Sequence, residues 1–402
     1  MANVSSSNGL EKRPKLRFPG FDEPWHGKPF GDLIQEYSDR TRTEDEDTLL
    51  SAAIEGMFLN TELFGHQRGA SNKGYKKIKY GTMVLSTQNL HLGNANVNLR
   101  FKHGMVSPAY KTYDITGCSI ELLAHWIKSD AAKHFFYNAT TVGASMCRRN
   151  VEWETLYEQP LFLPSTDEQD KIASFLSILT QRIDAQQKYV ATLKKYKRGL
   201  QNRFFFKRSH LSSKPSEIDS HDVKPLGSVV HINPKTGALP EAFIYIDLEC
   251  VESGVLNSKK LLSRNSAPSR AQRLLEEGDL LYQMVRPYQK NNYYFQKNFE
   301  YPTVASTGYA QIRCSEVDTQ FIYEQLSSDY FAREAMLRST GTGYPAINAD
   351  DLAEIPIWIP PLDQQEKIGA ALSFLGAKIE VHQKLLSALC TVKSSLLQQL
   401  FI

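Results

Sequence analysis

The chain has 402 residues, of which 41% are hydrophobic and 23% charged, as is typical of folded proteins rather than disordered or fibrous ones. Its net charge of +3 is too small to indicate a class of partner, so the distribution of charge is more informative than its sum. No stretch approaches about 18 uninterrupted apolar residues, and the N-terminal segment is polar where a signal peptide would be apolar, so we expect a cytoplasmic protein that does not contact a membrane.

The first 162 residues predict a short tail followed by an α+β domain. We expect residues 1–16 to be disordered and residues 17–162 to form the domain, with strands at 81–86 and 96–101 and helical residues at 120–136. The acidic segment TEDED, which includes Asp45 to Asp47, is expected to be an exposed loop.

Within this domain, residues 63–113 contain eight Lys or Arg residues and no Asp or Glu. A basic surface without acids is typical of proteins that bind a phosphate backbone, although a merely solvated basic face is the alternative. Asn and Gln side chains, which can pair with adenine, are interleaved with these charges. The candidate DNA-binding residues here are Arg68, Lys73, Lys76, Lys77, Lys79, Gln88, Asn89, His91, Asn94, Arg100 and Lys102, and Asn96 and Asn98 belong to the same stretch.

Residues 163–208 predict a long helix. Its apolar residues follow the 3,4 spacing of a heptad seam: Ile172, Leu176, Leu179, Ile183, Val190, Leu193 and Leu200. Asp167 stands where a helix N-cap is expected. We expect residues 209–222 to be a linker.

The second half repeats this plan. We expect a second α+β domain at 223–358, with strands at 243–247, 278–285 and 309–313 and helical residues at 319–336, and a second long helix at 359–402. Two acid-free basic runs, at 253–275 and 280–299, extend the candidate DNA-binding set to Lys259, Lys260, Arg264, Arg270, Arg286, Tyr288, Gln289, Lys290 and Asn291, and Tyr344 is added from GYPAIN. The second seam is Ile368, Leu372, Leu375, Ile379, Leu386, Leu389 and Leu396, with Asp363 as the expected N-cap.

The two halves are a tandem repeat. Residues 163–205 align without a gap to residues 359–401, with 15 of 43 positions identical, at an offset of 196. Offsets of 196 to 198 recur at FGDLI and LGSVV and at two further positions, which a chance match between two amphipathic helices would not produce. Because an exposed apolar seam is unfavourable, we expect the two helices to form an antiparallel coiled-coil pair with pseudo-two-fold symmetry.

The sequence contains no motif for catalysis. The segment GASNKGYKK has Tyr75 where a phosphate-binding loop needs Lys, and neither HExxH nor an adenine methyltransferase motif is found. The five cysteines, Cys118, Cys147, Cys250, Cys314 and Cys390, form no CxxC pair, which argues against a disulfide framework or a Cys-type zinc site. We therefore predict no catalytic residue, metal or cofactor in this chain.

The patterns RFPGFDEPW, GDLLYQMVRPY, GYPAIN and the doubled proline-then-DEQxKI motif resemble the specificity (S) subunits of type I restriction-modification systems. The resemblance covers nearly the whole chain. It implies two target recognition domains that read the halves of a split site in double-stranded DNA, with paired helices that space them and dock the methyltransferase (M) subunits. It also implies that M subunits use S-adenosylmethionine, and that restriction/translocase (R) subunits use ATP and magnesium.

Other functions remain possible at this point. A stand-alone nuclease or methyltransferase would need a carboxylate cluster or cofactor loop, and a purely structural coiled-coil adaptor would leave the basic runs unexplained. A specificity protein for another methyltransferase class, or a half-site variant made by recombination between the copies, would carry the same sequence features.

Overall fold

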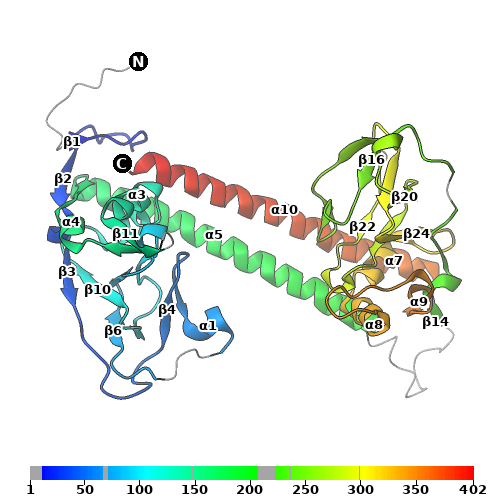
Figure 1. The fold of residues 1–402 in the computed structure, drawn as a ribbon, viewed down its shortest axis with the longest axis horizontal. Coiled ribbons are helices and arrows are strands. Elements are labelled where there is room, and N and C mark those ends of the chain that lie inside the picture. The colour runs from blue at the N-terminus through cyan, green and yellow to red at the C-terminus, as the bar shows by residue number, and fades with distance from the viewer. Residues whose placement is uncertain (1–10, 67–70, 146–147, 207–221, 236, 298) are drawn as a thin grey trace. The chain divides into compact units, whose positions relative to one another are not determined.

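The computed structural model describes residues 11–66, 71–145, 148–206, 222–235, 237–297 and 299–402. The chain divides into two compact units, whose elements are labelled in Figure 1. Unit 1 consists of Met1–Gln186 and Leu385–Ile402, and unit 2 of Gln187–Lys384. Each unit therefore combines one α+β domain with a segment of each of two long helices.

A four-stranded antiparallel sheet lies at the centre of unit 1. Its order is β3 (Ile34–Tyr37), β10 (Tyr110–Ile115), β7 (Met83–Ser86) and β8 (Ala95–Val97). The strand β7 is buried on both faces, and because side chains alternate along a strand, its residues enter two different cores. Met83 and Leu85 enter the core shared with α2 (Ile120–Trp126) and α3 (Asp130–Asn138), whereas Val84 enters a second core.

Smaller elements complete unit 1. They are β1 (Glu11–Lys12), β2 (Trp25–Pro29) and β13 (Pro160–Leu163) in one sheet, the pairs β4 (Leu50–Ala52) with β5 (Met57–Leu59), β6 (Lys76–Lys79) with β9 (His103–Val106), and β11 (Thr140–Ser145) with β12 (Arg148–Val151), the helices α1 (Asn60–Phe64) and α4 (Trp153–Glu158), and the 3-10 turns η1 (Phe30–Leu33) and η2 (Leu90–Leu92).

Unit 2 repeats the same sheet. Its order is β15 (Val230–Ile232), β24 (Tyr309–Cys314), β21 (Leu280–Gln283) and β22 (Tyr293–Tyr294), again antiparallel. Leu280 and Tyr282 of β21 enter the core with α7 (Thr319–Leu326) and α8 (Asp329–Arg338), and Leu281 enters the second core. The repeat found in the sequence is thus a repeat of sheet order and of core layering.

The remaining elements of unit 2 include a second four-stranded sheet with one parallel pair, β16 with β23. They are β19 (Lys260–Ser263), β16 (Ala242–Ile246), β23 (Thr303–Ser306) and β20 (Ala271–Leu274) in that sheet, the pairs β14 (Val223–Pro225) with β25 (Pro356–Trp358) and β17 (Val251–Glu252) with β18 (Val255–Leu256), the helix α9 (Ala349–Ala353), and the 3-10 turns η6 (Leu226–Ser228), η7 (Arg264–Ser266) and η8 (Pro287–Gln289).

The two long helices are α5 (Thr166–Gln201), which continues as a π-helical turn η3 (Asn202–Phe206), and α10 (Leu362–Leu400). In unit 1, Ile172 and Leu176 share the main core with Leu397 and Leu400. In unit 2, the Tyr189 and His382 rings have centroids 4.8 Å apart, and Leu200 packs on the core that contains Leu372. Residue numbers rise on one helix as they fall on the other, so the expected antiparallel pairing is confirmed within each unit.

All the predicted seam residues are buried or half-buried. The buried ones are Ile172, Leu176, Val190, Leu193, Leu372 and Ile379, and the half-buried ones are Leu179, Ile183, Leu200, Ile368, Leu375, Leu386, Leu389 and Leu396. The outermost of them, at both ends of each helix, pack into the domain cores rather than only on the other helix.

Several local predictions are wrong. The expected helices at 120–136 and 319–336 are each two helices, because Ser129 and Ser328 cap a new helix by accepting hydrogen bonds from backbone N–H groups three residues on. Asp167 and Asp363 lie inside the first turns of the long helices rather than at the caps.

The disordered tail was predicted as residues 1–16, but its last residues belong to the ordered domain. Residues 11–16 are ordered, since Glu11 and Lys12 pair with β2 and the Leu16 N–H donates to the Gln399 carbonyl oxygen at 3.0 Å. Most of the predicted linker lies outside the described residues. In the part of the chain that the structure describes, no helix combines the length and hydropathy that a membrane span needs.

Candidate nucleic-acid interface

Unit 2 contains an open cleft of about 520 Å³ that brings together predicted DNA-binding residues from separate segments. Arg270, Arg286, Gln289, Asn291 and Tyr344 all line it. They come from the residues before β20, from the turn after β21, and from the loop that follows α8. The cleft lies at the C-terminal end of β21, where the chain leaves the buried core.

Buried Gln283, the last residue of β21, organises the cleft. Its amide nitrogen donates to the Val285 carbonyl oxygen at 2.7 Å and to the Gln289 side-chain oxygen at 2.8 Å, and its own oxygen accepts from the Asn291 N–H at 3.1 Å. Because every polar atom of Gln283 is used internally, this residue fixes the loop rather than contacting a ligand. Gln283 was not predicted as a functional residue.

Two loops meet at Arg286. Its N–H donates to the Pro345 carbonyl oxygen at 2.7 Å, and its guanidinium lies over the Tyr344 ring, 4.3 Å from the centroid. The isolated bridge between Val285 and Ala346 adds a second link between the loops. Tyr344 and Tyr288 are the exposed aromatic residues here, at 70% and 52% exposure.

Unit 1 has the equivalent surface. The turn η2 follows β7 as η8 follows β21, and Gln88 and Asn89, between β7 and η2, are exposed. Burial and the nearby charge of Arg149 lower the pKa of half-buried His91. Arg149, which was not predicted, stacks on the Tyr137 ring at 4.1 Å and donates to the Thr140 hydroxyl oxygen at 2.7 Å. The hairpin of β11 and β12 therefore stands beside this turn, as the 340–346 loop stands beside η8.

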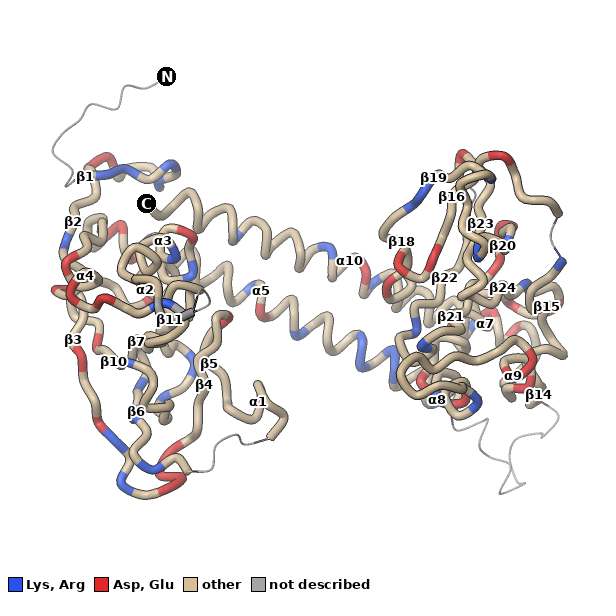
Figure 2. The backbone as a smooth tube through the Cα atoms, in the orientation of Figure 1, with Lys and Arg blue, Asp and Glu red and all other residues tan. Residues whose placement is uncertain are grey.

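The basic runs are not acid-free in three dimensions, so that prediction is wrong. Figure 2 shows acidic segments among the basic ones in both units. In unit 1, Arg100 pairs with Glu62 at 2.7 Å and Lys79 with Asp114 at 3.0 Å. In unit 2, Lys260 pairs with Asp247 at 2.6 Å, and Lys290 pairs with Asp329. These acids lie outside the basic runs in sequence, which is why the runs alone could not reveal them.

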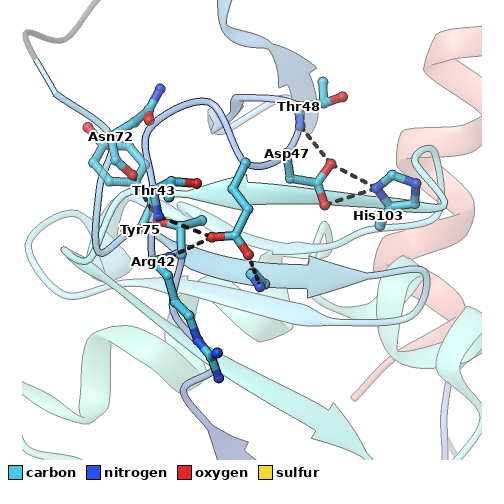
Figure 3. Close-up of polar contacts among 10 residues, drawn as sticks. Arg42, Thr43, Asp47, Thr48, Asn72, Tyr75 and His103 are labelled. Carbon is cyan, nitrogen blue, oxygen red and sulfur yellow. Dashed lines mark hydrogen bonds and ion pairs between the residues drawn. The ribbon is translucent and has the colours of Figure 1, made fainter.

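The acidic loop at 43–47 is exposed as predicted, but it also neutralises part of the basic run (Figure 3). The hydrogen bond and ion pair with Lys77 hold the pKa of Glu46 at about 2, and His103 Nδ1 lies 2.7 Å from the Asp47 carboxylate. The Asp45 N–H donates to Asn72 at 2.7 Å and fixes the loop. The loop is therefore part of the domain's internal charge balance.

Asn94 and Lys76 are wrongly predicted as DNA-binding residues, because both are buried. Asn94 and Asn96 donate to the carbonyl oxygens of Ala52 and Ala53, and Asn98 donates to those of Lys79 and Phe101. Amides that satisfy backbone groups in this way stabilise irregular loops. The same hydrogen-bonding capacity that suits adenine is used here inside the protein.

The remaining candidates differ in their exposure to solvent and in whether they form an ion pair. Exposed side chains without an ion pair among the described residues are Lys73, Gln88, Asn89, Lys102, Lys259, Arg264, Arg270, Tyr288, Gln289 and Tyr344. Lys259 stands over the Phe299 ring at 4.0 Å. Arg68 lies outside the described residues. Among the residues that are described, no group of three His, Cys, Asp or Glu side chains could hold a metal ion.

Comparisons with known proteins find similarity to specificity subunits of type I restriction enzymes. Residues 222–390 match the family model described as Type I restriction modification DNA specificity domain. The chain is 26% identical over 239 residues to the type I restriction enzyme MjaVIII specificity subunit of Methanocaldococcus jannaschii, covering 55% of this chain and 56% of that one. It is 24% identical over 346 residues to the putative MjaX specificity subunit of the same organism, covering 82% and 74%.

Among solved structures, the type I restriction-modification system S subunit from M. genitalium aligns with 97% of this chain and 99% of its own length, at a TM-score of 0.62 and 16% identity. This likeness shows the fold. The alignment with the MjaVIII subunit spans only about half the length of that relative.

The fold is that of a type I S subunit, with two tandem α+β domains and two long helices. Residues 222–390 match the model of a type I DNA specificity domain, and the resemblance expected from the sequence is confirmed. Both curated relatives are named as specificity subunits of type I restriction enzymes.

Proposed function

We propose that this chain is the non-catalytic DNA-recognition subunit of a type I restriction-modification complex and that it reads a bipartite site in double-stranded DNA. One observation carries the proposal. The same turn after the same central strand recurs in both units, with different side chains at equivalent positions: Asn89 and His91 in unit 1, Arg286 and Tyr288 in unit 2. A constant scaffold with variable polar and aromatic residues that are exposed or half-buried suits two readers of different base sequences.

Joining two readers in one chain has a physical advantage. Each domain alone would bind DNA weakly, because much of its positive charge is neutralised internally. Once one half-site is bound, the second binding event is intramolecular, and its effective concentration depends on the span between the readers. In this proposal the paired helices set that span and thereby the spacing of the two half-sites.

The long helices also carry a second apolar stripe, which supports docking of M subunits. In unit 1 the exposed residues include Ile178, Leu385 and Val392, at 63%, 38% and 50% exposure. In unit 2 their repeat equivalents Phe374, Tyr189 and Tyr196 are 69%, 39% and 57% exposed. Exposed apolar stripes of this kind mark protein interfaces. Their repetition supports one M subunit on each unit.

The chemistry belongs to the partners in this proposal. M subunits would bind S-adenosylmethionine and methylate adenine N6, and R subunits, where present, would use ATP and magnesium. The residues of this chain would select the DNA site and position those subunits on it.

The test is to co-express the chain with the methyltransferase encoded beside it and to map N6-methyladenine across the host genome by long-read sequencing. We expect a single split motif that disappears when this chain is omitted. A soluble complex that yields no motif and shows no salt-dependent DNA affinity would contradict the proposal and favour a structural adaptor.

A further inference from the structure

Arg286 is held rigidly in the cleft of unit 2, yet its guanidinium makes no hydrogen bond among the described residues. The backbone is fixed by the bond to Pro345, and the guanidinium plane by the Tyr344 ring at 4.3 Å. The Nε atom is buried and has no hydrogen-bond partner in the part of the chain that the structure describes. Since buried polar groups are normally paired, this one is poised for a partner that the chain itself does not supply.

The backbone here is also strained. Arg286 and Lys290 flank η8 with φ angles of 56° and 54°, in the left-handed region that non-glycine residues rarely adopt. Such conformations are energetically unfavourable and cluster at ligand-binding positions. The strain at Lys290 accompanies an internal ion pair with Asp329, whereas the strain at Arg286 directs a guanidinium with no such pair into the cleft.

The neighbours of Arg286 favour a base edge over a phosphate. Gln289 uses its side-chain oxygen to accept from Gln283, so its amide hydrogens stay available as donors. Exposed carboxylates of Glu249 and Glu252 line the same cleft and would repel a phosphate group. A cleft that offers oriented donors beside carboxylates fits the major-groove edges of bases, where guanine O6 and N7 accept and cytosine N4 donates.

We infer that Arg286 reads a guanine in the half-site bound by unit 2, donating to its O6 and N7 atoms, and that Tyr344 is the residue that positions the guanidinium. This inference rests on the proposed function and adds the base and the side chain that recognises it. The planar fork of arginine matches the two acceptors of guanine, whereas the point charge of lysine does not. The repeat equivalent in unit 1 is Asn89, so the two half-sites are read with different chemistry.

The test uses the full chain in complex with its methyltransferase, comparing Arg286→Lys with the wild type. The methylated motif is mapped first, and binding is then measured to duplexes that carry the motif or each single base-pair replacement. We expect Arg286→Lys to lose about 5- to 150-fold of discrimination at one G·C pair in one half-site, with the other positions unchanged. Tyr344→Ala should relax the same position less strongly, and Tyr344→Phe should restore it.

Lys224→Ala, on the exposed face of β14, is the matched control for loss of a positive charge and should leave the motif unchanged. Uniformly weaker binding by Arg286→Ala to every sequence, with a smaller salt dependence that Arg286→Lys does not show, would identify a phosphate contact and overturn the inference. A motif unchanged or relaxed only at an A·T pair would also overturn it. If the wild-type complex modifies no specific sequence, both the proposed function and the inference about Arg286 are wrong.

Discussion

The side-chain oxygen of Gln365 accepts a hydrogen bond from the Asp318 N–H at 3.0 Å, while its amide nitrogen donates to the Pro360 carbonyl oxygen at 2.7 Å. Gln169 does the same in unit 1, with the Ser119 N–H at 2.9 Å and the Pro164 carbonyl oxygen at 3.0 Å. Ser119 and Asp318 are the N-caps of α2 and α7. The glutamine of the repeated DEQxKI pattern therefore joins each long helix to its domain.

Replacing Gln365 tests this joint. Gln365→Ala leaves one buried and one partly buried backbone group without its partner, and we expect a loss of about 2–4 kcal/mol in the free energy of unfolding, measured by urea denaturation. The neighbouring exposed Gln364 supplies the control, since Gln364→Ala should change stability by less than about 0.5 kcal/mol. Equal effects of the two substitutions on stability would contradict the role of Gln365 in joining α10 to its domain.

A charge in the helix seam should be poorly tolerated. Leu193 is 8% exposed, so Leu193→Asp would bury a carboxylate without a counter-ion, and we expect a loss of at least about 3 kcal/mol, measured by thermal and urea unfolding. Ala191→Asp, two residues away on the exposed face, should be nearly neutral. A Leu193→Asp chain of normal stability would argue against the buried seam.

His125 makes the stability of unit 1 depend on pH. Burial, together with the charge of Lys393, lowers the pKa of His125 to about 4, and its Nε2 lies 3.1 Å from the Ser177 hydroxyl. The unfolded state then binds the proton more readily, so stability falls as pH drops from about 6.5 towards 4. Between pH 7.5 and 5 we expect a loss of about 2 kcal/mol from this group.

His125→Gln isolates that contribution. Urea denaturation at both pH values should show a smaller loss for this variant than for the wild type, because other titrating groups act equally in both. Parallel pH dependence of the two proteins would rule out the assigned role of His125.

The exposed stripe on α10 should matter for assembly but not for folding. Phe374 is 69% exposed, so Phe374→Asp should leave the unfolding midpoint unchanged while weakening co-purification with the methyltransferase at least tenfold. Ser387→Asp, on another exposed face of the same helix, is the control. Unaltered assembly of Phe374→Asp would place the M subunit elsewhere.

Two candidate DNA-binding residues of unit 1 should respond differently to substitution by alanine. Lys102 is exposed, and Lys102→Ala should weaken binding to all DNA sequences and reduce the slope of log affinity against log salt concentration by about one. Asn94→Ala should instead lower stability by about 1–3 kcal/mol, since Asn94 is buried against the chain around Ala52. Salt-dependent binding assays and urea denaturation distinguish the two.

The architecture could be predicted because repetition is visible in one sequence. The heptad spacing around Ile172 and Ile368 and the nearly constant offset indicated two domains and two antiparallel helices, which the structure has. The candidate interface was harder to predict. The loops of Arg286 and Tyr344 meet although 58 residues separate them in sequence, and only GYPAIN hinted at the second loop.

The errors have a common physical cause. Arg100 meets Glu62 and Lys290 meets Asp329 across long sequence separations, so a run of one sign says little about local charge in the folded domain. Asn94 was misread because an amide serves a backbone carbonyl as well as a base edge. Gln169 and Gln283 give no periodic signal, since their roles depend on which loop lies opposite.

Unit 1 is assembled from segments at both ends of the chain. Its main core includes Leu397, Leu400 and Phe401, and the ring of Phe401 meets that of Trp25 with centroids 6.5 Å apart. Unit 2, in contrast, is one continuous stretch, Gln187–Lys384. On the ribosome, domains generally fold as their residues emerge. The domain of unit 1, which is translated first, therefore cannot complete its core until the last turns of α10 have been made, whereas unit 2 can complete its core earlier.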